Sequence, residues 1–150
     1  MPLTDIRHFI LFADGTATAG QPTRDQFSEI AAAGYDVVIN LAMPTSAGAI
    51  PDEAEVVTSL GMEYIALPVV WEAPTSADLE RFFEAMAATQ GRRRFVHCAA
   101  NMRVSAFLFL YRVRKLGMVE AEAEKDLYRI WRPTGWWEAF IEAHSEEPSP

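Results

Sequence analysis

Residues 94–105 read Arg94-Phe95-Val96-His97-Cys98-Ala99-Ala100-Asn101-Met102-Arg103-Val104-Ser105, and this stretch decides the fold. Phe95 and Val96 end an apolar run that predicts a buried strand, and Arg103 begins an apolar segment long enough for a helix. The residues between them therefore form a turn from a strand into a helix. Such a turn directs backbone N–H groups and the positive end of the helix toward one point.

This turn also carries the only cysteine of the chain, Cys98. A positive helix end and a nearby cation such as Arg103 favour the thiolate form of a cysteine. The thiolate, rather than the thiol, is the nucleophile. The turn is therefore a candidate site at which a thiolate meets an oxyanion.

The rest of the chain alternates between strand-like and helix-like segments. The predicted strands are 9–12, 16–19, 37–41, 62–69 and 95–97. The predicted helices are 24–33, 52–60, 76–90, 103–115, 120–131 and 135–144. This alternation predicts an α/β fold of three layers, in which helices flank a central, mostly parallel sheet of four or five strands. We expect one domain over residues 1–150, with a frayed acidic tail at 145–150.

Composition excludes several classes of function. With 150 residues, 50% of them hydrophobic, the chain suits a single globular domain. A net charge of −8 and a pI near 4.8 predict that nucleic acid and anionic membrane surfaces are not partners. A single cysteine excludes an intrachain disulfide and favours a reducing, cytoplasmic compartment. The three histidines are far apart in the sequence, so we expect neither a metal nor a cofactor.

Leu41, Val69 and Cys98 lie at or just after the ends of three predicted strands. In open α/β sheets, ligands bind beyond the carboxyl ends of the strands. We therefore expect the loops 42–51, 70–75 and 99–103 to meet on one side of the molecule and to form the site.

The segment His97-Cys98, followed by Arg103 and Ser105, resembles the signature of the cysteine-dependent tyrosine and dual-specificity phosphatases. Other segments resemble a small bacterial phosphatase-like group that is also described as sulfurtransferases. They are Gly20-Gln21-Pro22-Thr23, Gly34-Tyr35, Val38-Ile39-Asn40-Leu41, Gly61-Met62-Glu63-Tyr64 and Leu67-Pro68-Val69. The resemblance implies a cysteine-phosphatase-like fold with Cys98 as nucleophile and Arg103 as a clamp on two oxygens.

The same resemblance assigns roles to the neighbouring residues. The backbone of Ala99, Ala100, Asn101 and Met102 would complete a phosphate-binding loop by donating N–H bonds to the remaining oxygens. His97 would stiffen that loop and help to keep Cys98 ionised.

The loop departs from the phosphatase pattern at three positions. Four residues separate Cys98 from Arg103, where the pattern has five, so the loop has one N–H donor fewer. Asn101 replaces the usual glycine, and asparagine tolerates positive φ better than other residues with a side chain. Val104 stands where the pattern has a hydroxyl, and Ser105 provides the nearest hydroxyl for a departing thiolate.

A general acid is needed to protonate most leaving groups. Glu72 is the only carboxylate in the loop 70–75, so it is the candidate for this acid; the alternative is that Glu72 is a solvated surface residue without a role in catalysis.

The sequence leaves two further points open. Gln21 and Asn40 are candidates for holding the site loops. The four tryptophans, Trp71, Trp131, Trp136 and Trp137, either pack in the core or border a pocket for an aromatic ligand.

Together these features favour a hydrolase, a phosphatase that acts on phosphotyrosine, aryl phosphates or small phosphoesters through a cysteinyl-phosphate intermediate. Its partners would be a phosphoprotein or a phosphorylated small molecule. Two alternatives remain. The short loop is the length expected of a rhodanese-like sulfurtransferase, which would use Cys98 to carry sulfur. A non-catalytic anion-binding protein would keep Arg103 and the N–H groups without an acid.

Overall fold

Five strands form one sheet in the order β1-β2-β5-β3-β4, in a computed structural model that describes residues 2–146. The strands are β1 (Ile10–Leu11), β2 (Ala17–Ala19), β3 (Val37–Asn40), β4 (Glu63–Ala66) and β5 (Arg94–His97). β1 and β2 form an antiparallel hairpin, whereas β2, β5, β3 and β4 are parallel to one another. The predicted sheet, mostly parallel and of up to five strands, is confirmed.

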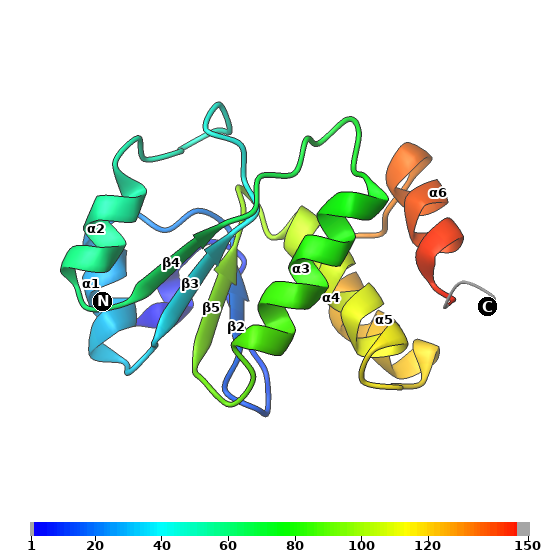
Figure 1. The fold of residues 1–150 in the computed structure, drawn as a ribbon, viewed down its shortest axis with the longest axis horizontal. Coiled ribbons are helices and arrows are strands. Elements are labelled where there is room, and N and C mark those ends of the chain that lie inside the picture. Colours follow the sequence, from blue (N-terminus) through cyan, green and yellow to red (C-terminus); the bar gives the residue numbers. More distant parts are fainter. Residues whose placement is uncertain (1, 147–150) are drawn as a thin grey trace.

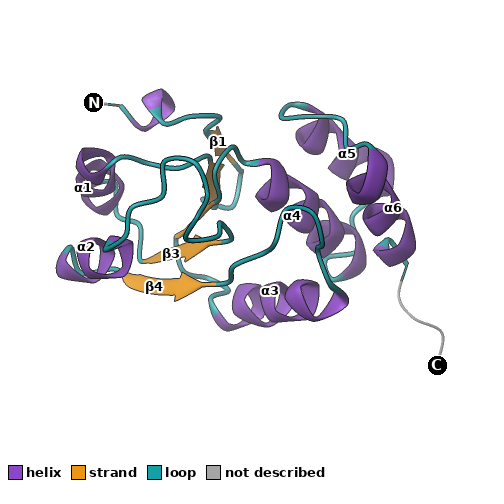
Figure 2. Ribbon diagram, turned by 90° about the horizontal axis from the view of Figure 1, so that it is seen from above, coloured by secondary structure: helices purple, strands orange, loops and turns teal. Residues whose placement is uncertain are grey.

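Helices cover both faces of this sheet. They are α1 (Arg24–Ala32), α2 (Glu53–Ser59), α3 (Ser76–Ala88), α4 (Met102–Arg114), α5 (Glu120–Tyr128) and α6 (Gly135–His144), preceded by a short 3-10 turn at Leu3–Asp5. Figures 1 and 2 show α1 and α2 on one face, α3 and α4 on the other, and α5 and α6 outside α4. The predicted three-layer arrangement is therefore confirmed.

Two apolar clusters form the core, one on each face of the sheet. Val37, Ile39 and Val96 pack with the residues of α3 and α4, whereas Val38 and Phe95 pack with those of α1 and α2. Successive strand residues point to opposite faces, so a strand covered on both sides must be apolar at every position. This requirement explains the unbroken apolar runs that identified β3 and β5.

Local end signals define two helices as predicted. The Thr23 hydroxyl accepts from the Gln26 backbone N–H, and the Gln26 side chain accepts from that of Thr23. Thr75 and Asp78 form the same reciprocal pair at the start of α3. Each pair satisfies two backbone donors that the first turn of a helix leaves without partners.

Most predicted boundaries differ from the structure by one or two residues, and two predicted ends differ by more. β4 ends at Ala66 instead of 69 because Pro68 has no N–H to donate, although the Val69 N–H still reaches the Leu41 carbonyl at 2.9 Å. α5 ends at Tyr128 instead of 131. Pro133 disfavours a helical conformation at the residue before it, Arg132, so the helix ends ahead of that position. Of the predicted tail at 145–150, residues 147–150 lie outside the described residues.

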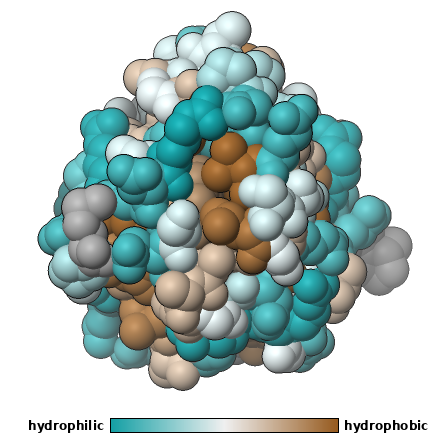
Figure 3. All heavy atoms as spheres, turned by 90° about the vertical axis from the view of Figure 1, so that its left-hand side faces the viewer, coloured by the Kyte–Doolittle hydropathy of each residue, from teal (hydrophilic) through white to brown (hydrophobic). Residues whose placement is uncertain are grey.

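The face formed by α1 and α2 is mostly polar, with apolar residues in a hollow near its centre (Figure 3). Within residues 2–146, no helix combines the length and apolar character that crossing a membrane requires.

Candidate active site

Cys98 lies directly after β5, where the sheet passes into α4. Its side chain is buried with 1% exposure, and its N–H donates to the Ala19 carbonyl at 3.3 Å. Asn101 has a positive φ of 63°, and α4 begins at the next residue. Because asparagine tolerates the left-handed conformation, the chain makes this turn without the glycine of the phosphatase pattern. The segment 98–103 is called the cysteine loop below.

The cysteine loop carries backbone N–H groups that have no acceptor. Within residues 2–146, no hydrogen bond involves the N–H of Ala99, Ala100, Met102 or Arg103. Met102 and Arg103 belong to the first turn of α4, whose N–H groups have no partner within the helix, and Ala99 and Ala100 directly precede that turn. These donors are therefore free for an anion at the N-terminus of α4.

Arg103 connects the cysteine loop to two other loops. Its guanidinium, only 6% exposed, donates to the Val69 carbonyl at 2.8 Å and to the Ser46 hydroxyl at 3.3 Å. Ser46 belongs to the loop 42–51, and Val69 immediately precedes the loop 70–75. Figure 1 shows these loops above the end of the sheet where β5 passes into α4. Arg103 thus joins the cysteine loop to the loop 42–51 and to Val69, the residue that leads into the loop 70–75.

His97 is fully buried beneath the cysteine loop and pairs with a glutamate. Its Nε2 lies 2.7 Å from Oε2 of Glu53, and its Nδ1 lies 3.2 Å from the Cys98 carbonyl oxygen. An ionised carboxylate and a carbonyl both accept hydrogen bonds only. His97 therefore links the Glu53 carboxylate to the backbone of Cys98.

Glu53 is the site residue that the sequence did not reveal. It is 3% exposed and also accepts from the side-chain amides of Gln21 at 2.8 Å and Asn40 at 3.1 Å. Burial alone would raise the pKa of Glu53, but the hydrogen bonds and charge of His97, with further hydrogen bonds from Gln21 and Tyr64, lower it below its usual value. Glu53 is therefore a buried carboxylate held in its charged form.

Gln21 and Asn40 hold the loops around this carboxylate. Besides its bond to Glu53, the Asn40 side chain accepts from the Ala42 N–H at 2.8 Å and donates to the Tyr64 hydroxyl at 3.0 Å. Burial raises the pKa of Tyr64 to about 12, so its hydroxyl keeps its proton at neutral pH. The amide network thus fixes the start of the loop 42–51.

Gly20 allows the N-terminal segment to lie against the cysteine loop. A Cβ at this position would be 2.7 Å from the Ala99 carbonyl oxygen and 3.2 Å from Cα of Ala100. Contacts this short with backbone atoms are not tolerated, so the position requires glycine. The neighbouring Gln21 N–H donates to the Ala99 carbonyl at 3.0 Å.

The tryptophans pack against one another and anchor the loop 70–75. The ring of Trp71 lies 5.4 Å from those of Trp131 and Trp137, and its carbonyl accepts from the indoles of Trp136 and Trp137. Glu72, the next residue, is exposed, and within residues 2–146 no hydrogen bond or ion pair links its carboxylate to another predicted site residue. The structure therefore fixes the backbone next to Glu72 without placing its carboxylate against Cys98.

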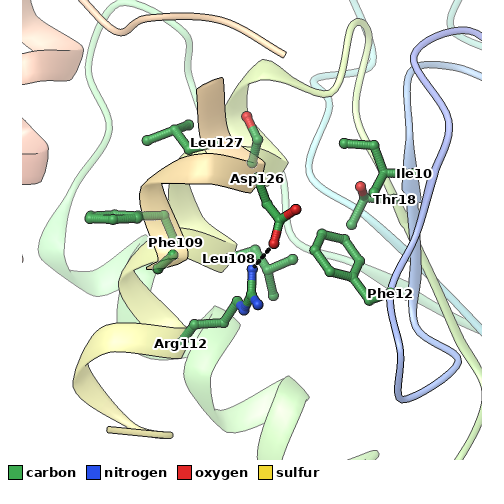
Figure 4. A pocket seen from close by; sticks show the side chains of 10 residues that line it. Ile10, Phe12, Thr18, Leu108, Phe109, Arg112, Asp126 and Leu127 are labelled. Atoms are coloured by element: carbon green, nitrogen blue, oxygen red, sulfur yellow. Dashed lines mark hydrogen bonds and ion pairs between the residues drawn. The ribbon is translucent and has the colours of Figure 1, made fainter. Parts of the chain in front are cut away.

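Ser105 and Met102 lie on α4 and interact with Trp131. The Ser105 hydroxyl donates to the Met102 carbonyl at 3.0 Å, and the Trp131 indole donates to both residues at 3.1 Å. Ser105 also lines a cavity of about 10 Å³, enough for one water, which Figure 4 shows beside the pair of Arg112 and Asp126. The hydrogen bonds of Ser105 are thus made to α4 and Trp131 rather than to Cys98.

No group of three or more His, Cys, Asp or Glu in residues 2–146 is arranged to hold a metal ion.

Known proteins share this fold and part of this sequence. A protein from Shewanella putrefaciens CN-32, described as a DUF442 phosphatase, is 38% identical, with a TM-score of 0.84 over 95% of this chain and 94% of its own. The catalytic domain of the PP-IP phosphatase SIW14 from S. cerevisiae has the same fold at 12% identity, with a TM-score of 0.76 over 93% of this chain and 86% of its own.

Among curated proteins, a "Beta-lactamase hydrolase-like protein" of Xylella fastidiosa (strain 9a5c) is 31% identical in an alignment of 130 residues that covers 81% of this chain. The matched part is 30% of that protein, so the chain spans about a third of its length. Residues 12–134 match the family described as DSP-PTPase phosphatase fused to NAD+ kinase. The chain therefore belongs to this family of dual-specificity and tyrosine phosphatase domains.

Proposed function

We propose that this protein is a cysteine-dependent phosphatase that acts on phosphotyrosine, aryl phosphates or other small phosphoesters. The observation that supports the proposal most directly is the set of four unpaired N–H groups in the cysteine loop, between Cys98 and the first turn of α4. These donors suit the oxygens of a phosphoryl group, and phosphoryl transfer depends mainly on positioning and on neutralising such oxygens.

Cys98 and Arg103 have the direct roles in this reaction. The Cys98 sulfur attacks phosphorus and forms an S–P bond, while the bond from phosphorus to the leaving oxygen breaks. Water then attacks the cysteinyl phosphate, releasing inorganic phosphate and restoring the thiolate. Arg103 uses two donors for Val69 and Ser46, and a guanidinium has five N–H donors, so three remain for the phosphoryl oxygens.

The general acid limits the range of substrates. Glu72 is exposed, and it is the carboxylate available in the loop after Val69. An acid that is not held against the reacting group protonates alkyl leaving groups poorly, whereas nitrophenolate leaves without a proton. We therefore expect aryl phosphates to be better substrates than alkyl phosphates.

Hydrolysis of 4-nitrophenyl phosphate by the wild-type protein and by Cys98→Ser tests this proposal. We expect phosphate release by the wild type and its loss, by at least about a hundredfold, in Cys98→Ser, because serine is a much weaker nucleophile at neutral pH. Lys125→Gln, a change at a solvent-exposed position on α5, is the control for nonspecific effects. Activity that survives in Cys98→Ser would overturn the assignment of the nucleophile.

A rhodanese-like sulfurtransferase is the second candidate, and the four-residue spacing between Cys98 and Arg103 favours it. In that reaction, the thiolate would take the outer sulfur of thiosulfate, releasing sulfite, and cyanide would then accept the sulfur as thiocyanate. Formation of thiocyanate that depends on Cys98, without release of phosphate from nitrophenyl phosphate, would replace the phosphatase proposal.

A further inference from the structure

A second cavity adjoins the cysteine loop. It has a volume of about 420 Å³ and lies between the N-terminal segment, the start of α1 and the loop 42–51. Its wall includes Arg7, Gln21, Arg24, Ile50 and, from the cysteine loop, Ala99. This volume is within the range of sites for small ligands. A group attached to a phosphate at the cysteine loop therefore has a place to extend into.

The two arginines of this cavity differ in whether a carboxylate pairs with them. Arg24 forms an ion pair with Asp52, and the hydrogen bond from Arg24 lowers the pKa of that carboxyl. Arg7 is exposed and, among the residues that the structure describes, its guanidinium makes no hydrogen bond or ion pair. Arg7 thus supplies an uncompensated positive charge to the cavity.

Arg7 is also held close to the cysteine loop. The Gly20 N–H donates to the Arg7 carbonyl at 2.6 Å. A Cβ built on Gly20 would lie 3.3 Å from Cβ of Arg7 and 3.2 Å from Cα of Ala100, so Arg7 and Ala100 flank this glycine. The arginine side chain therefore begins beside the loop that carries Cys98.

We propose that Arg7 and this cavity form a subsite for a second anionic group, so that the preferred substrates are phosphoesters carrying another carboxylate or phosphate. The proposal rests on the phosphatase function proposed above. The phosphoryl group occupies the cysteine loop, and the second anion pairs with the Arg7 guanidinium. An anion bound in this way is only partly shielded from water, so its contribution to the binding free energy is that of a partly screened ion pair.

A matched pair of substrates tests the subsite: 4-carboxyphenyl phosphate and its uncharged amide, 4-carbamoylphenyl phosphate. We expect wild-type kcat/KM to favour the carboxylate about fivefold, consistent with an ion pair of about 1 kcal/mol. In Arg7→Gln the ratio should fall to about one, whereas in Arg92→Gln, an equal change of charge at the opposite end of β5, the wild-type ratio should persist. A wild-type ratio of one, or an unchanged ratio in Arg7→Gln, would overturn the subsite.

Binding separates failure of the subsite from failure of the phosphatase function. The probes are 4-(phosphonomethyl)benzoate and its amide, which cannot be hydrolysed, titrated calorimetrically into wild-type protein and Arg7→Gln. Tighter binding of the carboxylate that is lost in Arg7→Gln supports the subsite even if no phosphate is turned over. Turnover of both phosphates together with equal binding of both phosphonates overturns the subsite and leaves the phosphatase function standing.

Discussion

Replacing Glu53 by glutamine is the most direct test of the buried network beneath the cysteine loop. The carboxylate accepts from Gln21 on one oxygen and from His97 and Asn40 on the other. Glutamine has a single acceptor oxygen, so in either orientation its NH₂ group faces a donor. One buried donor is left unsatisfied, which costs about 1–3 kcal/mol, and the bond to His97 loses about half its strength when the acceptor is no longer charged. We expect a total loss of about 3 kcal/mol in the free energy of unfolding.

The measurement is unfolding in urea at pH 7, supported by the melting temperature. For a chain of this size, about 3 kcal/mol corresponds to a decrease of roughly 6–12 °C in Tm. Glu55→Gln is the matched control, because Glu55 also lies in the first turn of α2 but is exposed. A double-mutant cycle with His97→Gln should give a coupling energy of about 1.5 kcal/mol or more. A Glu53→Gln stability within about 0.5 kcal/mol of the Glu55→Gln value would refute the reasoning.

The pairing of Glu53 with His97 also predicts how the stability of the protein depends on pH. The folded-state pKa of Glu53 is below its usual value of 4.5, so the unfolded chain binds the proton more readily than the folded protein does. The contribution of Glu53 is therefore complete above pH 4.5 and is lost as the pH falls through the folded-state pKa. Glu53→Gln should remove this part of the acid dependence, and an unchanged slope below pH 4.5 would contradict it.

Three further substitutions test other parts of the site. Gly20→Ala should destabilise the protein by about 1–3 kcal/mol, because its Cβ would be 2.7 Å from the Ala99 carbonyl; stability equal to that of the wild type would contradict this contact. Asn101→Ala should be about 1 kcal/mol less stable than Asn101→Gly, since both lose the side-chain bonds to His8 and Thr18 but only alanine is strained at a φ of 63°. Glu72→Gln should lower kcat for alkyl phosphates more than for 4-nitrophenyl phosphate, and an equal effect on both would remove Glu72 as the acid.

Sequence patterns predicted the elements whose signals are local. Thr23 with Gln26 and Thr75 with Asp78 mark helix starts through bonds that span three residues, so no distant contact is needed to form them. The apolar run at 37–41 likewise identifies a strand buried on both faces. The predicted parallel sheet also brings the carboxyl ends of β3, β4 and β5 to one edge, whereas the order of the strands comes from the structure alone.

The role of Glu53 depends on which face of a helix meets the sheet. Glu53 and Glu55 are both acidic residues in the first turn of α2, where either one stabilises the helix. Residues two apart in a helix project about 200° apart, so only one of them can face inward. Val57, four residues after Glu53, is fully buried on the same side, and this apolar residue is the one signal in the sequence that favours Glu53. The partner of Glu53, His97, is 44 residues away, and no local pattern connects them.

The spacing between Cys98 and Arg103 also has a consequence that only the structure explains. Because Asn101 makes the turn and α4 begins at Met102, Arg103 is the second residue of the helix. Its guanidinium is positioned by the Val69 carbonyl and the Ser46 hydroxyl, both outside the cysteine loop. One more residue between the start of α4 and the arginine would move the arginine along the helix and rotate its origin by about 100°, away from these acceptors. The short spacing and the two acceptors are therefore matched to each other, and the anion site depends on the loops after β3 and β4 as much as on the cysteine loop.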